Sequence, residues 1–151
     1  MAAADQLARE SGSKPAQLAA RIAMVPLLSG NERLPALAAL VGEAERLGDA
    51  ALTLTVLADA ADAARESGDL DTAQRLGRRG LRSPIRIDSW KDNWRLHWLL
   101  AQSVEAPEAG ESLVAARSEI RRLVEGMPGA WRDGFRDALP EELKDVEVED
   151  R

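Results

Sequence analysis

Apolar residues recur every three or four positions along most of the chain, which is the periodicity of an amphipathic helix. Polar or glycine-containing breaks separate these runs, and residues that favour helix starts or ends stand beside the breaks. Pro26 predicts that the first helix bends or ends early. The pattern predicts seven helices, which span residues 13–28, 34–47, 50–67, 70–82, 89–104, 107–126 and 130–139.

The clearest signal is the segment from Leu57 to Pro84, which predicts two helices folded back on each other. Gly68 can adopt the left-handed conformation that ends a helix, and the Asp69 carboxylate can cap the next one. Small side chains let the two helices approach closely, at Ala60, Ala61, Ala64 and Ala73. The segment therefore predicts an antiparallel helix hairpin.

The spacing of the helices predicts a repeat. The second helices of successive hairpins begin at Leu34, Leu70 and near Pro107, which are steps of 36 and 37 residues. Such a step is typical of stacked helix hairpins. We expect a helical-repeat domain over residues 1–139, and then an acidic tail over 140–151 with at most one further helical turn.

The hairpin resembles the unit of tetratricopeptide-repeat (TPR) proteins. The matching large, small and turn residues are Leu57, Ala60, Ala61, Ala64, Gly68, Asp69, Ala73, Gly77, Gly80, Leu81 and Pro84. Gly77 departs from the pattern, since the family usually has a large residue there. The resemblance implies a short right-handed superhelix with a C-terminal capping helix and a groove for a peptide or protein. The chain is also similar to helical-repeat segments of large bacterial regulatory ATPases and transcription factors.

Composition supports the all-α fold and limits the classes of partner that the protein is expected to bind. Ala and Leu greatly outnumber Val, Ile and Thr, so we expect no sheet. The net charge of -6 disfavours binding to nucleic acid or to an anionic membrane, because both of these partners are polyanions. The longest apolar run, Pro35 to Val41, is too short to cross a bilayer, and the first residues lack a signal-peptide core. We expect a cytoplasmic protein.

The predicted helix over 89–104 has two apolar faces. One face consists of Leu96, Leu99, Leu100 and Ser103, and the other of Trp90, Trp94, His97, Trp98 and Ala101. In one interpretation the aromatic face is an internal core covered by Trp131 and Phe135. In the other it lines the groove, so that Trp90, Trp94, His97 and Trp98 contact a partner.

An arginine stripe follows the second helix of the central hairpin, at Arg75, Arg78, Arg79 and Arg82. Their spacing places them along one side, where they could hold an acidic peptide or a phosphate. The preceding helix carries an acidic stripe at Asp59, Asp62 and Glu66. The alternative interpretation is that the two stripes neutralise each other, and that arginines near a helix C-terminus complement its dipole.

Catalytic and metal-binding chemistry lack candidates. The chain has one histidine, no cysteine and no glycine loop after a strand, so we expect no enzyme activity, no metal site and no cofactor. The sequence predicts a noncatalytic scaffold that binds a protein or peptide in the groove. The alternative is a regulatory sensor domain with a small apolar ligand between the tryptophans. A further possibility is a piece of a longer superhelix.

Overall fold

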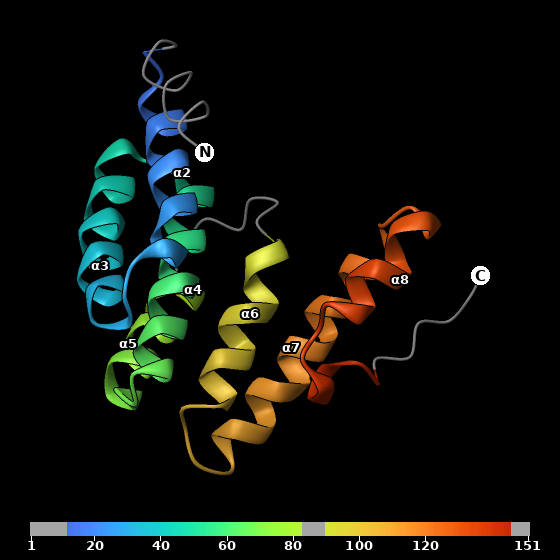
Figure 1. Ribbon diagram of the computed structural model, residues 1–151. Coiled ribbons are helices and arrows are strands. Elements are labelled where there is room, and N and C mark those ends of the chain that lie inside the picture. Colours follow the sequence, from blue (N-terminus) through green and yellow to red (C-terminus); the bar gives the residue numbers. More distant parts are fainter. Residues whose placement is uncertain (1–11, 83–89, 146–151) are drawn as a thin grey trace.

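The computed structural model describes residues 12–82 and 90–145, and every regular element in these ranges is helical (Figure 1). The α-helices are α2 (Lys14–Met24), α3 (Gly30–Leu47), α4 (Ala50–Glu66), α5 (Leu70–Leu81), α6 (Trp90–Ala101), α7 (Glu108–Glu125) and α8 (Gly129–Asp137). Two single 3-10 turns are η1 (Val25–Leu27) and η2 (Glu141–Leu143). The predicted all-α fold is confirmed for this part of the chain. Each helix described is too short or too polar to cross a bilayer.

Consecutive helices pack against each other from α2 to α7, and the first helices of successive pairs also touch, since α4 contacts both α2 and α6. The pairs α2–α3, α4–α5 and α6–α7 therefore follow one another along the molecule (Figure 1). α8 lies at the end opposite α2 and α3, and among the described helices it shares no extended helix–helix interface.

The turn within the central hairpin, between α4 and α5, forms as the sequence predicts, and the turn between α3 and α4 is built in the same way. Gly48 and Gly68 have φ angles of 68° and 81°, in the left-handed region that favours glycine. Asp49 Oδ1 accepts a hydrogen bond of 2.9 Å from Leu52 N, and Asp69 Oδ1 accepts one of 3.0 Å from Thr72 N. Glycine thus ends one helix and aspartate starts the next, twice in succession.

α3 begins earlier than predicted. The sequence SGNER predicts a loop before Leu34, but α3 begins at Gly30 and includes Pro35. Ser29 and Glu32 have the spacing of a capping box, but the Ser29 hydroxyl accepts no hydrogen bond from a backbone N–H and donates one to the Glu32 carboxylate instead. The first turn is therefore stabilised locally, although glycine and asparagine within it are poor helix formers.

Three apolar clusters hold the stack together. The largest joins α2, α3 and α4 around Leu18, Leu37 and Leu57. A small one joins α4 to α6 through Leu54, Ala58 and Leu96. The third joins α6 and α7 to the residues after α8, at Ala116, Ile120, Val124, Leu139 and Leu143. Packing thus extends past the domain boundary at residue 139 that the sequence predicts, while residues 146–151 of the expected tail lie outside the described ranges.

Two glycines let α5 approach α6. A Cβ atom added at Gly80 would lie 2.7 Å from Leu96 Cδ1, and one added at Gly77 would lie 3.8 Å from the Leu96 carbonyl oxygen. Leu96 is fully buried, so it has little room to move. The departure from the TPR pattern at Gly77 follows from this crossing, since a large side chain there would meet the α6 backbone.

We predict opposite effects for the two alanine substitutions. Gly80→Ala should destabilise the protein by about 1–3 kcal/mol, because the new methyl group overlaps Leu96. Gly77→Ala should be neutral or stabilise by about 0.5–1 kcal/mol, because alanine favours the helix and 3.8 Å is an ordinary contact. Urea unfolding followed by circular dichroism measures both. Equal stability of the two variants would contradict the crossing.

Leu143 tests whether the segment after Pro140 belongs to the folded domain. Leu143→Ala should cost about 2–5 kcal/mol, because a fully buried side chain would leave a cavity between α6 and α7. The neighbouring exposed residue provides the control, since Glu142→Ala should change stability by less than about 0.5 kcal/mol. If both variants unfold at the same urea concentration, η2 does not pack on the core.

Candidate functional site

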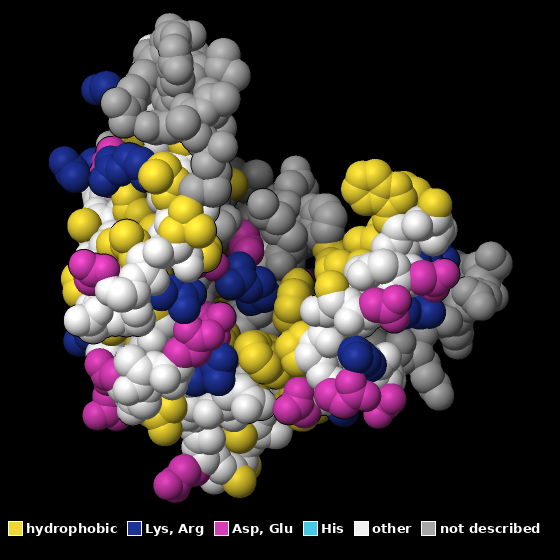
Figure 2. Space-filling model, in the orientation of Figure 1, with side chains coloured by type: hydrophobic (Ala, Val, Ile, Leu, Met, Phe, Trp, Pro, Cys, Tyr) yellow, Lys and Arg dark blue, Asp and Glu magenta, His cyan; other side chains and the backbone are white. Residues whose placement is uncertain are grey.

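A polar surface lies where α4 packs beside α6, and we name it the inner face. It consists of Thr55, Asp59, Asp62 and Arg65 from α4 and of Asp92, Arg95 and Trp98 from α6. The α4 residues share one side of the helix, while the sides that carry Leu54 and Ala58 are buried. Charged side chains of both signs gather over α4, with hydrophobic ones beside them toward α7 (Figure 2).

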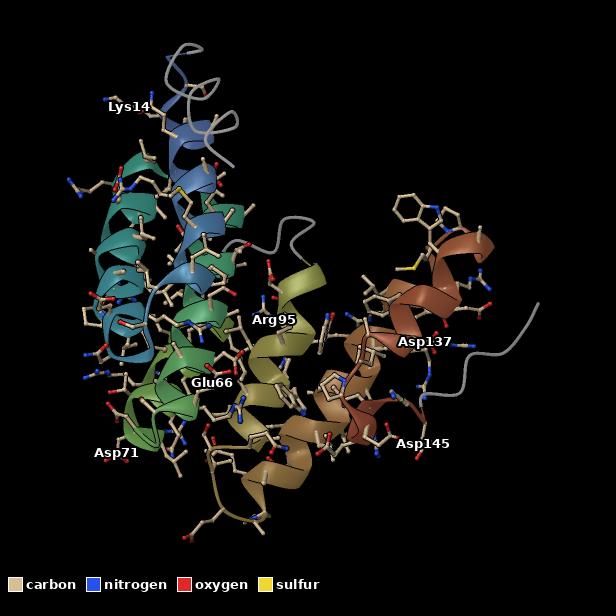
Figure 3. The ribbon with its side chains drawn as sticks, in the orientation of Figure 1. Lys14, Glu66, Asp71, Arg95, Asp137 and Asp145 are labelled. Atoms are coloured by element: carbon tan, nitrogen blue, oxygen red, sulfur yellow. The ribbon has the colours of Figure 1, made fainter. Side chains whose placement is uncertain are left out.

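Arg95 connects the two helices of the inner face and lies between them in Figure 3. Its Nη2 is 2.7 Å from Asp59 Oδ1 on α4, and its Nη1 is 3.3 Å from Asp92 Oδ1 on its own helix. Burial lowers the pKa of Arg95, but Asp59 and then Asp92 raise it by more, so the net shift is upward. The guanidinium therefore stays charged.

Asp92 is the most deeply buried charged group of this surface, with 4% of its area exposed. Its Oδ2 accepts a hydrogen bond of 2.7 Å from the Thr55 hydroxyl, and Arg95 contacts its Oδ1. Both carboxylate oxygens thus have partners, as a buried charge requires.

Arg65 and Trp98 form the apolar edge of the inner face. The Arg65 guanidinium carbon lies 5.4 Å from the centre of the Trp98 ring, within cation–π range. Asp62 Oδ1 accepts from Arg65 Nη2 at 2.8 Å and holds the guanidinium beside the ring. The Trp98 indole nitrogen is buried and has no hydrogen-bond partner among the described residues.

The aromatic face of α6 divides between core and surface. Trp94 and Trp98 pack, half-buried, against Ile120 and Leu143, and the Phe135 ring meets Trp94 edge-on with centroids 6.4 Å apart. Trp131, proposed as a second cover, is 72% exposed. Trp90 begins α6, but its side chain lies outside the described residues.

His97 lies half-buried on α6, with the Glu119 carboxylate of α7 near enough to act on it. Burial lowers the pKa of His97, and Glu119 opposes that shift without cancelling it. The imidazole is therefore held in its neutral form to a lower pH than in an unfolded chain.

The arginine stripe does not pair with the acidic stripe of α4, contrary to the neutralisation that the sequence suggests. Arg78 contacts Glu108 of α7 at 2.9 Å, and Arg79 pairs with Glu45 of α3. The α4 acids have other partners: Asp59 bonds Arg95, Asp62 bonds Arg65, and Glu66 bonds Arg33 of α3 at 2.8 Å. Each stripe faces a different neighbour because α4 and α5 bury their alanine and glycine sides against each other and α6.

The arginine stripe and the aromatic face are therefore separate surfaces. Arg75, Arg78, Arg79 and Arg82 line a depression of about 600 Å³ together with Asp71 and Gln74. Figure 3 places Asp71 at the outer end of α5, far from Arg95. The predicted partner-binding residues whose side chains the structure describes thus belong to two places, and a single ligand groove does not contain them all.

Sequence reasoning missed Asp92 and Arg95, which complete the inner face. Arg95 and Asp59 are 36 residues apart, which equals the predicted repeat step, although the helices that carry them begin 40 residues apart, at Ala50 and Trp90. A search for opposite charges one repeat apart would have found this pair. The described residues contain no group of three side chains suited to a metal ion.

Comparisons of the chain with protein-family models, with curated proteins and with solved structures find no match. Its function is therefore inferred from the surfaces described above.

The lowered pKa of His97 predicts a pH dependence of stability. Above about pH 6.5 the imidazole is neutral in both states, whereas below it the unfolded chain takes up a proton that the folded chain resists. The free energy of unfolding should therefore fall as the pH drops through and below this value. His97→Gln should show a smaller fall between about pH 7.5 and pH 5.5 in urea unfolding. The same fall in both proteins would show that His97 does not contribute.

Proposed function

We propose that the chain is a noncatalytic, TPR-like scaffold in which three helix hairpins present the inner face to an extended segment of a protein partner. The pairs α2–α3, α4–α5 and α6–α7 are the proposed hairpins, and α8 is the proposed closing helix. The observation that carries this proposal is a row of charged groups held in place between α4 and α6 yet open to solvent. Asp59, Asp62, Arg65 and Arg95 each keep between 28% and 30% of their side-chain area exposed.

The polar groups of the inner face suit a peptide main chain. The carboxylates of Asp59 and Asp62 can accept from peptide N–H groups, and the outward edge of Arg95 can donate to peptide carbonyls. The ion pairs already order these side chains, so a ligand would lose less conformational entropy on binding than it would with mobile side chains. A preorganised polar row is the form of surface that binds an extended segment.

The edge formed by Arg65 and Trp98 supplies an apolar contact for the same ligand. Trp98 is half-buried, and Arg65 covers one side of its ring. A ligand side chain that packs beside this pair would gain contact area with a rigid ring, which costs little side-chain entropy. The inner face thus offers both main-chain hydrogen bonds and one anchor.

A small-molecule pocket between the tryptophans is the weaker alternative. Ile120, Leu139 and Leu143 pack against Trp94 and Trp98, and Phe135 lies on Trp94, so side chains fill much of that side. A protein or peptide partner therefore fits the arrangement better.

Selection of peptides on the immobilised full chain tests the proposal, followed by calorimetry with wild type and Asp62→Ala/Arg65→Ala. We expect enriched peptides whose affinity falls at least about tenfold in the variant, because the variant loses a peptide acceptor and exposes the Trp98 ring to water. Asp62 and Arg65 are three residues apart on one helix and partly exposed, so the fold should remain intact.

The control removes another ion pair with the same spacing, the exposed pair at η2, by Glu141→Ala/Lys144→Ala. This variant should bind the peptides as wild type does. If the selected peptides bind all three proteins equally, the inner face is not the binding surface. If no peptide is enriched on the folded protein, the scaffold function itself is contradicted.

A further inference from the structure

We infer that the depression on α5 is a second, separate binding site, which takes a phosphomonoester dianion such as a phosphorylated side chain of a partner. We name it the arginine hollow, and it consists of Arg75, Arg78, Arg79 and Arg82 with Gln74 and Asp71 at its rim. Its residues are distinct from those of the inner face, so the two sites are tested independently. The ligand of the arginine hollow differs from an extended peptide, because it would be recognised by its charge and its compact shape.

Two of the four arginines are already oriented by carboxylates. Arg78 donates from Nε and Nη2 to Glu108, at 3.2 and 2.9 Å to Oε1. Arg79 donates to Glu45 of α3. These pairs tie the guanidinium groups to α7 and α3, and they leave other N–H groups of each fork for a ligand.

The other two arginines form no ion pair with a carboxylate of the described ranges, although the Asp69 carboxylate is near enough to Arg75 to act on it electrostatically. Arg75 contacts the Thr72 hydroxyl at 3.3 Å, a weak and neutral partner. Arg82 makes no ion pair and no hydrogen bond with a described residue, although it lines the hollow. Asp71 also lines the hollow, but no ion pair joins it to these arginines in the described part. Two cations without an ion pair to a described residue thus face one concave surface of a protein whose net charge is -6.

The spacing of these cations suits a compact anion. Arg75, Arg78 and Arg82 are three and four residues apart, so neighbouring Cβ atoms lie about 5–6 Å apart on one side of the helix. Long side chains at this spacing can converge on one tetrahedral group and donate to several of its oxygens. The helix dipole accounts for cations near the end of α5, but it does not require that they line a depression.

Charge favours a dianion over a carboxylate. A phosphomonoester carries close to two negative charges near neutral pH and offers three acceptor oxygens. The two guanidinium groups without an ion pair, those of Arg75 and Arg82, match that charge. A glutamate side chain offers one charge, and Arg78 and Arg79 already bond to carboxylates of that kind.

The test is a titration monitored by the arginine Nε–H signals in NMR, at low salt and with sodium chloride of equal ionic strength as reference. The probes are inorganic phosphate and one short peptide in three forms: with serine, with phosphoserine and with glutamate at the same position. We expect saturable shifts at Arg75, Arg78 and Arg82 with inorganic phosphate and with the phosphoserine peptide. Tighter binding of the phosphopeptide would identify a protein side chain as the source, and equal binding would identify the free anion.

Arg75→Gln/Arg82→Gln should lower the phosphate affinity at least about tenfold. The control Arg21→Gln/Arg46→Gln removes the same charge from exposed sites on α2 and α3, and it should leave the phosphate affinity unchanged. Arg75 and Arg82 are exposed and bridge no two helices, so the fold should persist, and the single variant Arg82→Gln provides a milder second test. Any of three results would overturn the site. These are equal losses of phosphate affinity in both double variants, Nε–H shifts spread over all arginines, and equal binding of the glutamate and phosphoserine peptides. None of these results depends on the inner face.

Discussion

The placement of Leu96 determines how α6 sits on the central hairpin. This fully buried side chain lies between two helices at once, against Leu54 and Ala58 of α4 and against Gly80 of α5. It fits only because α4 and α5 have small residues where it enters, and a single added Cβ atom would overlap it. Burying a leucine contributes roughly 1.5–3 kcal/mol, but the geometric consequence is larger than that energy suggests. The preceding residue of the chain, Arg95, is thereby brought to Asp59, and Trp98, about one turn after Arg95, is brought to Arg65.

The polar contacts of the inner face specify this packing more than they strengthen it. Partly exposed ion pairs contribute about 1 kcal/mol or less each, because water competes for both partners. Asp92 differs, since burial removes its hydration. The Thr55 hydroxyl and the Arg95 guanidinium replace the hydrogen bonds to water. Sliding α6 by one turn along α4 would remove the Thr55 hydrogen bond and leave Oδ2 of that carboxylate without its partner. Apolar burial therefore supplies the stability, and Asp92 penalises the wrong register.

Local signals in the sequence are sufficient for the helices and their caps, and insufficient for the surfaces. Gly68 and Asp69 end and start helices through groups within four residues of each other, so their roles are readable in order. The start of α3 was mispredicted because its glycine outweighed the helix-start spacing of Ser29 and Glu32, whose side chains bond to each other. Periodicity assigns a residue to a helix face, but it does not say which neighbour that face meets. The two charged stripes were paired with each other for this reason, whereas Arg79 bonds to α3, Asp59 bonds to α6 and Asp62 bonds within its own helix.

The outer side of the stack shows why a ligand of the arginine hollow must be more than an ordinary carboxylate. Arg78 and Arg79 connect α5 to α7 and α3 through Glu108 and Glu45, and any anion that approaches them competes with those groups. The competing pairs are half-exposed and individually weak, so loosening one would cost little of the apolar packing beneath. At Arg78 or Arg79 a monoanion would only exchange one carboxylate for another and gain almost nothing. A dianion gains because it can also bind Arg75 or Arg82, and these cations form no ion pair with a described residue that they would have to give up.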